Sequence, residues 1–150
     1  MLMPIWTLLL ALGCAPPPVG VDAAVAEPSI EILFPESDPD ITYCPVFTVV
    51  VDVDNLEYST EDRLGGDHVE GQGHWHLYVN GEYIAYELKD WSTTPALEEG
   101  LNQLSVDLAQ NDHQPYEVNG DVPTYIAEIT VGDVEGCVGG GSPAAMDTGY

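Results

Sequence analysis

The stretch Gly71-Gln72-Gly73-His74-Trp75-His76-Leu77-Tyr78-Val79-Asn80-Gly81 decides the fold that we predict for this chain of 150 residues. Trp75, Leu77 and Val79 alternate with His74, His76 and Tyr78, and a period of two is typical of a β-strand with one buried face. The dipeptide Asn80-Gly81 then predicts a tight hairpin, because a type I′ turn needs positive φ at both central positions. A strand, a turn and a return strand therefore form the centre of the predicted fold.

Further segments show the same alternation, and Gly, Pro, Asn and Asp separate them. They cover residues 30–34, 47–53, 84–88, 104–108 and 125–131. About seven short strands in a domain of about 110 residues predict an all-β fold, an antiparallel immunoglobulin-like β-sandwich. The residues that we expect to face its core are Phe47, Val49, Val51, Trp75, Leu77, Leu104, Val106, Leu108, Ile129 and Val131.

The chain opens with an apolar run from Met1 to Cys14. At about fifteen residues this run is shorter than the roughly twenty that cross a hydrocarbon core, and it predicts a signal peptide over residues 1–13. Its end, Leu12-Gly13-Cys14, resembles a bacterial lipobox, which implies that Cys14 becomes lipidated. The alternative is an ordinary signal peptide with an incidental Cys14, since Met1-Leu2-Met3 carries no basic residue.

The predicted domain organisation follows from this leader and from composition. After the signal peptide we expect a lipidated, Pro-rich linker over residues 14–27, the β-sandwich over residues 28–137, and a flexible Gly-rich tail over residues 138–150. A lipid anchor makes the membrane a partner of the protein. Ala15 rather than Asp follows Cys14, and by resemblance to bacterial sorting this predicts an outer-membrane lipoprotein of the cell envelope.

Two cysteines remain, Cys44 and Cys137, close to the ends of the predicted domain. In an exported protein an even number of cysteines predicts a disulfide bond. The bond would close a loop of about 93 residues and stabilise the fold by roughly 4 kcal/mol. Two free thiols are the alternative.

The charge of the chain is strongly acidic: 26 Asp and Glu residues face two basic ones, which gives a net charge of −24. A negative field of this size repels DNA and RNA, so we expect no nucleic-acid partner. One interpretation is a solvated acidic surface. The other is a calcium site at Asp52 and Asp54, where carboxylate oxygens would bind the ion, although the full EF-hand pattern is absent.

The histidines provide the chain's main candidate for metal chemistry. His74 and His76 lie two residues apart on a predicted strand, so both rings leave the same face. Trp75 faces the core, which places the histidines on the outer face or near its rim. His113 lies in the loop after the 104–108 strand and could reach a neighbouring strand. Three imidazoles with an open position suit copper(II) or zinc. The alternative is surface histidines bonded to nearby carboxylates.

The hairpin also predicts a register for the return strand. If Val79 and Glu82 flank the Asn-Gly turn, Glu87 lies opposite His74 and Ala85 lies opposite His76. Glu87 would then orient His74, as carboxylates orient metal-bound histidines, or form a plain cross-strand pair. Ring nitrogens within about 4 Å of one another would favour a metal site.

The stretch from Gly71 to Gly81, with Gly100-Leu101-Asn102-Gln103-Leu104-Ser105-Val106 and Asn111-Asp112-His113-Gln114-Pro115, resembles a group of uncharacterised exported bacterial proteins and lipoproteins. Their pattern runs G-x-G-H-x-H, a strand and turn, a G-x-H-x-L strand and D-H-x-P. The resemblance implies a β-sandwich over about residues 45–131 and matches His74, His76 and His113. It departs at Asn102-Gln103, where the group often has a histidine, and it implies no settled activity.

Motifs for catalysis are absent from the sequence. We find no HExxH, G-x-S-x-G, P-loop or dinucleotide fingerprint. The sequence therefore predicts a non-catalytic, lipid-anchored envelope β-sandwich that acts as a binding or structural module, with an unknown protein or a metal as its partner. The first alternative is a copper- or zinc-binding envelope protein that uses the three histidines. The second is a calcium-dependent adhesion module.

Overall fold

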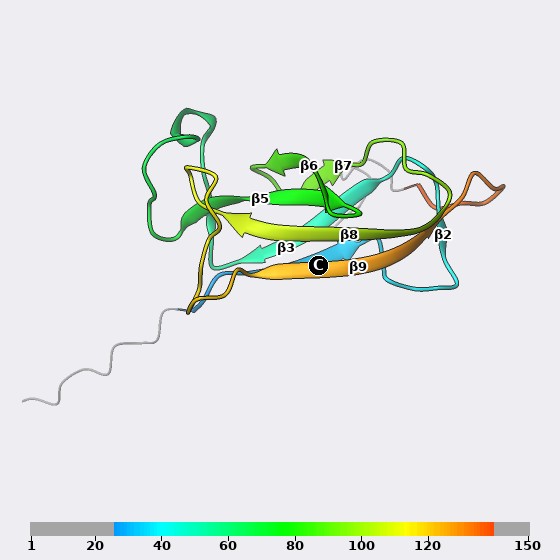
Figure 1. The fold of residues 1–150 in the computed structure, drawn as a ribbon, viewed down its shortest axis with the longest axis horizontal. Coiled ribbons are helices and arrows are strands. Elements are labelled where there is room, and N and C mark those ends of the chain that lie inside the picture. The colour runs from blue at the N-terminus through cyan, green and yellow to red at the C-terminus, as the bar shows by residue number, and fades with distance from the viewer. Residues whose placement is uncertain (1–25, 140–150) are drawn as a thin grey trace, which may run out of the picture.

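The computed structural model describes residues 26–139, whose strands form two facing layers (Figure 1). One layer is a three-stranded sheet with the order β1 (Ser29–Phe34), β3 (Thr48–Asp54) and β7 (Trp91–Thr93). The six-stranded layer has the order β2 (Thr42–Tyr43), β9 (Thr124–Val131), β8 (Gly100–Ala109), β5 (Gln72–Val79) and β4 (Glu57–Tyr58), and β6 (Glu82–Glu87) also pairs with β5. The predicted lipidation of Cys14 lies outside the described residues, as do the predicted signal peptide and most of the linker and tail.

These two layers confirm the predicted all-β sandwich. The described part contains a single 3₁₀ turn, Glu61–Arg63, as its helical element. Strands β2, β4 and β7 were not predicted, because two or three residues are too few to show an alternating pattern. The pairs β2–β9 and β4–β5 are parallel and the other strand pairs are antiparallel.

The core lies between the sheets, and every residue that the alternation assigned to it is buried. Trp75, Val49, Leu77, Leu104, Val106 and Leu108 have no exposed surface, and Phe47, Val51, Ile129 and Val131 expose at most 2%. The indole Nε1 of Trp75 donates a hydrogen bond to the carbonyl oxygen of Lys89 at 2.8 Å. Trp75 therefore lies fully buried in the core, as the sequence predicted.

The hairpin turn has the predicted conformation, with φ of 51° at Asn80 and 80° at Gly81. The predicted register of β6 is wrong, because a β-bulge between Tyr83 and Ala85 adds one residue to this strand. Glu87 consequently lies opposite Trp75 rather than His74. Its carboxylate accepts a hydrogen bond from Ser92 Oγ at 2.8 Å and pairs with Lys89 Nζ at 3.2 Å.

Cys44 and Cys137 form a disulfide bond with a Cα–Cα distance of 5.0 Å. The bond lies just beyond β2 and joins the chain after β9 to the sheet, where the Cys44 amide donates to the carbonyl oxygen of Val138 at 3.0 Å. Within residues 26–139, no helix has the length and apolar character needed to span a membrane.

Candidate metal centre

The candidate centre lies on the outer face of the six-stranded sheet, at the end where β5 begins and β8 ends. His74 and His76 project from β5 on the face opposite Trp75. They are nevertheless buried, with 0% and 8% of their surface exposed, whereas His113 is exposed. The outer face of this sheet is therefore closed to solvent at His74 and His76.

The three rings converge. His74 Nε2 lies 3.0 Å from His76 Nε2 and 3.0 Å from His113 Nδ1. One nitrogen of each ring can be chosen so that all three lie within 4.8 Å of one another. Nitrogens bound to one zinc ion at about 2.0–2.1 Å are separated by at most about 4 Å. Two pairs already meet this condition, and the farthest pair would have to approach by about 1 Å.

Tyrosines of the β5–β6 hairpin surround the rings. Tyr86 lies directly opposite His76. The centroid of its ring is 5.8 Å from that of the His74 ring and 5.5 Å from that of the His113 ring. Tyr83 lies 5.4 Å from the His76 ring. These aromatic rings cover part of the outer face, which explains why two histidines on that face are buried.

Glycines allow the start of β5 to approach β8 closely. A Cβ atom at Gly73 would lie far inside contact distance of the Ala109 carbonyl oxygen. Ala109 is also the cross-strand partner of His74. The amide of Gly71, where φ is +76°, donates to the Tyr116 hydroxyl at 2.9 Å. The G-x-G before the histidines thus lets β5, which carries His74 and His76, approach the end of β8, from which the chain continues to His113.

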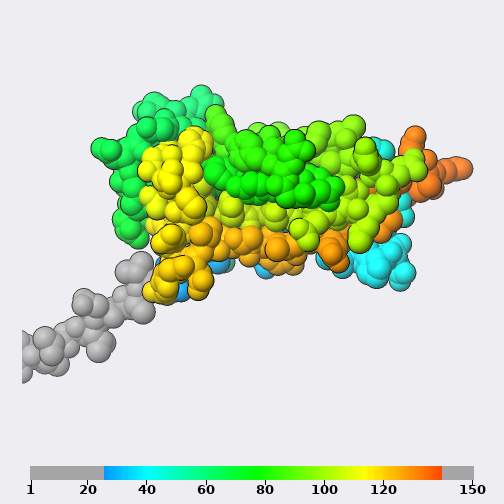
Figure 2. All heavy atoms as spheres, viewed as in Figure 1, coloured from blue at the N-terminus to red at the C-terminus, as the bar shows by residue number. Residues whose placement is uncertain are grey.

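Asn111 anchors the loop that carries His113. Its side chain is 1% exposed, accepts a hydrogen bond from Ser59 Oγ, and donates to the Asp67 carbonyl oxygen at 3.3 Å. The backbone carbonyl of Asn111 accepts from the Gly65 amide at 2.6 Å. Figure 2 shows the segment around residues 110–120, in yellow, beside the green segment around residues 60–70 at this end of the molecule.

His113 itself has φ of 63°, the left-handed region that few residues other than glycine adopt. Its amide donates to the Gln110 carbonyl at 3.0 Å, and the Gln114 amide donates to Asp112 Oδ1 at 3.0 Å. The tight loop turns the His113 ring back toward β5. The sequence predicted that His113 could reach a neighbouring strand, but it did not predict the positive φ of this residue.

The electrostatics of the centre favour neutral imidazole. Burial, and after it the nearness of His76 and His113, lowers the pKa of His74 to about 4. His74 is therefore neutral at pH 7, with its Nε2 directed at two other ring nitrogens. His74 Nδ1 is buried and has no hydrogen-bond partner among the described residues.

Sequence reasoning missed two groups behind His76. Asp107 Oδ1 lies 3.3 Å from His76 Nδ1, and the Tyr78 hydroxyl lies 3.3 Å from the same atom. Burial, followed by the charge of Asp107, raises the pKa of Tyr78 to about 12. Asp107 alternates with Val106 and Leu108, so its outward direction was readable from the sequence. Its partner was not, because the pairing of β5 with β8 was unknown.

Other predicted residues lie apart from this centre. Among the described residues, the three histidines are the only group of three or more His, Cys, Asp or Glu side chains whose ligand atoms converge. Asp52 and Asp54 are exposed on β3 and belong to no such group, so the calcium site stays a prediction. Asn102 is five residues from Asp107 along β8, about 17 Å away. Asn102 therefore lies outside the group that the three histidines form.

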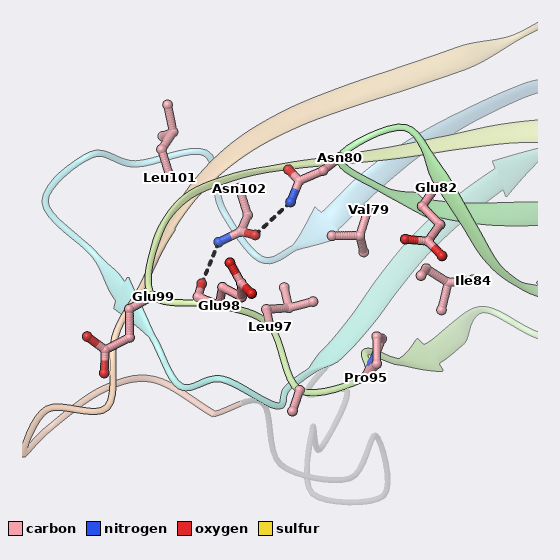
Figure 3. Close-up of a pocket in the computed structure, with 11 residues that line it drawn as sticks. Val79, Asn80, Glu82, Ile84, Pro95, Leu97, Glu98, Glu99, Leu101 and Asn102 are labelled. Atoms are coloured by element: carbon pink, nitrogen blue, oxygen red, sulfur yellow. Dashed lines mark hydrogen bonds between the residues drawn. The ribbon is translucent and has the colours of Figure 1, made fainter.

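Asn102 instead lines a hollow of about 370 Å³ near the hairpin turn (Figure 3). Its amide donates to the Glu98 carbonyl oxygen at 2.9 Å, and its side-chain oxygen accepts from Asn80 at 2.9 Å. The side chains of Val79 and Leu97 lie between the carboxylates of Glu82 and Glu98 (Figure 3). This hollow is separate from the histidines, which lie at the other end of β5.

Comparisons with known proteins give no family for the chain. No protein-family model matches the sequence, and no curated protein matches it. Among solved structures, fibronectin(III)-like modules of Clostridium thermocellum CbhA align with a TM-score of 0.45 and 13% sequence identity. The alignment covers 68% of this chain and 94% of that chain.

Proposed function

We propose that this protein is a non-catalytic, lipid-anchored β-sandwich of the bacterial cell envelope that binds a divalent transition-metal ion, copper(II) or zinc. His74, His76 and His113 would be the ligands. The observation that carries the proposal is the convergence of three ring nitrogens, two pairs of them 3.0 Å apart. The proposal joins the binding-module function that the sequence favoured with its first alternative, the metal site.

A cation suits this arrangement better than three neutral rings alone. His74 Nε2 has either one proton or one lone pair to offer, yet it faces two ring nitrogens at 3.0 Å. A metal ion accepts a lone pair from each ring at once. Three imidazole ligands leave a position open for water or another ligand, as in zinc sites that exchange ligands, and imidazole also suits copper(II).

The location rests on the sequence. The lipobox-like Leu12-Gly13-Cys14 supports the anchor, and Ala15 supports the outer membrane. Mass spectrometry of the mature protein is expected to find an acylated Cys14 as its first residue. An intact and unacylated Met1 would contradict this part of the proposal.

Metal binding is tested by titrating the metal-free protein with Cu²⁺ and Zn²⁺ in competition with a chelator. We expect about one equivalent of tightly bound metal in the wild type. His113→Ala should lose this binding, and because His113 is exposed the variant should keep its fold. His76→Ala should lose binding as well.

His68→Ala is the matched control, since His68 lies outside the centre and contacts Glu70 at 3.4 Å. It should bind like the wild type. Wild-type protein that binds neither ion at micromolar concentration would disprove the proposed function. Equal loss in His68→Ala and His113→Ala would show that binding is unspecific.

A further inference from the structure

We infer that Asp107 is a positioning residue of the metal centre, whose carboxylate holds the proton of His76 on Nδ1 so that Nε2 of the same ring binds the metal ion. The inference rests on the proposed function and adds to it a residue outside the ligand set. In this inference a residue of strand β8, Asp107, orients a metal ligand of strand β5, His76.

The placement of Asp107 follows from the strand register. Asp107 is the direct cross-strand partner of His76, and both side chains leave the outer face of the sheet. His76 presents its two nitrogens in different directions: Nε2 lies 3.0 Å from His74 Nε2, and Nδ1 lies 3.3 Å from Asp107 Oδ1. One ring nitrogen thus faces the centre while the other faces the carboxylate.

Asp107 Oδ1 needs a donor. It is buried and has no hydrogen-bond partner among the described residues. The two basic residues of the chain are engaged elsewhere, because Arg63 donates to Gln72 and Lys89 pairs with Glu87. A buried acceptor without a partner costs free energy, and an Nδ1–H group on His76, whose nitrogen lies 3.3 Å away, would remove that cost once the ring turns to align the bond.

The same proton fixes the ligand atom. A neutral imidazole carries its proton on one nitrogen, and the other nitrogen then has the free lone pair. A carboxylate behind Nδ1 therefore leaves Nε2 unprotonated and also makes it a stronger ligand. His74 lacks such support, since its Nδ1 has no partner in the described part of the chain.

Tyr78 is the competing partner, because its hydroxyl also lies 3.3 Å from His76 Nδ1 and can either accept from that nitrogen or donate to it. Hydrogen bonds to a carboxylate are stronger than those to a neutral hydroxyl. We therefore assign the positioning role to Asp107. The variant Tyr78→Phe distinguishes the two groups.

The test compares Asp107→Asn, Tyr78→Phe and the wild type. Glu128→Gln is the control for the lost charge, because Glu128 is an exposed carboxylate on β9 without a contact to the centre. Competition titration with Cu²⁺ is expected to show 10- to 100-fold weaker binding for Asp107→Asn, the range seen when a carboxylate behind a histidine ligand is removed. Glu128→Gln and Tyr78→Phe should bind within about threefold of the wild type.

A second readout does not depend on metal. Long-range ¹H–¹⁵N spectra of the metal-free protein report which ring nitrogen of His76 carries the proton. We expect the proton on Nδ1 in the wild type and a mixture of both tautomers in Asp107→Asn. A purely structural role of Asp107 would lower stability without changing the tautomer.

The outcomes separate this inference from the proposed function. Wild-type affinity in Asp107→Asn, or loss in Tyr78→Phe instead, would overturn the role of Asp107 and leave the metal centre standing. Failure of the wild type to bind Cu²⁺ or Zn²⁺ would overturn the proposed function and this inference together. Weaker binding with a changed tautomer would support both.

Discussion

At the scale of single residues, His74 determines the chemistry of the centre more than either of the other histidines. It has no exposed surface, and its Nε2 is the atom that approaches both other rings. A buried imidazole without a counter-ion is costly to protonate. The metal-free protein therefore keeps a neutral base at its centre, which leaves a lone pair available for a cation.

This burial makes the metal-free fold sensitive to acid. The pKa of His74 is about 4 in the folded state and about 6.5 in the unfolded chain. Between these values the unfolded chain binds more protons, so the free energy of unfolding falls as the pH decreases from 6.5 to 4. We expect His74 to contribute a loss of roughly 3 kcal/mol over this window, measured by urea unfolding in the presence of a chelator.

His74→Gln provides the comparison, because it removes this one imidazole and leaves every carboxylate in place. The variant should lack this component and show a flatter stability profile between pH 6.5 and 4. Parallel profiles for the two proteins would contradict the prediction. Saturating metal should hold all three histidines unprotonated in the folded state and therefore make the wild-type profile steeper over this range.

At the scale of elements, the centre depends on a strand and a loop that are fixed to each other. His74 and His76 are held by the ladders that β5 forms with β6 and β8. His113 lies on a loop whose backbone is held by Asn111 through contacts with the segment of residues 59–67. The loop is thus less constrained than strand β5. Substitution of its anchor, Asn111, is the most direct test of how the loop is held.

Asn111→Ala should loosen the loop. The change leaves the buried Ser59 hydroxyl without its acceptor and removes the bond to the Asp67 carbonyl, at an expected cost of about 1–3 kcal/mol in the free energy of unfolding. Metal affinity should fall as well, because His113 is no longer held in place. Gln114→Ala, an exposed change in the same loop, should alter neither quantity. Unchanged metal affinity in Asn111→Ala would contradict this role.

The sequence was informative where a regular pattern determines the element. Alternation identified the longer strands and the core, and Asn80-Gly81 identified the turn. The bulge in β6 left no comparable pattern, and one added residue was enough to move Glu87 from His74 to Trp75. The histidine set was predicted from spacing, but its burial and the position of Asp107 depend on which strands become neighbours. That pairing is a property of the whole sheet rather than of any local segment.

At the scale of the whole molecule, the disulfide bond and the metal centre lie at opposite ends of the sandwich. Cys44 follows β2 beside Val131, which pairs with Gly100, whereas the histidines lie beside Ala109. Gly100 and Ala109 are the two ends of β8, about 30 Å apart. Stability and metal binding should therefore respond separately to changes at the two ends.

The double variant Cys44→Ser/Cys137→Ser tests this separation. The bond closes a loop with a sequence separation of 93 residues, so its removal should lower the free energy of unfolding by about 4 kcal/mol. The folded variant should still bind about one equivalent of metal. Urea unfolding measures the first effect and chelator competition the second. An unchanged unfolding midpoint would contradict the first expectation, and lost metal binding in folded protein the second.

The net charge of −24 also acts on the whole molecule. Both basic residues already have partners, and the remaining carboxylates repel one another in the compact state. Between 0.01 M and 0.15 M NaCl the Debye length falls from about 30 Å to about 8 Å, which weakens this repulsion. We expect the Tm of the metal-free protein to rise by on the order of 5 °C, about 1 kcal/mol for a domain of this size. A lower Tm in salt would show instead that ion pairs dominate.

CaCl₂ provides a separate test of the predicted calcium site. At equal ionic strength it should add nothing to the Tm beyond screening if the acidic surface is merely solvated. Extra stabilisation that disappears in Asp52→Asn would favour the calcium site.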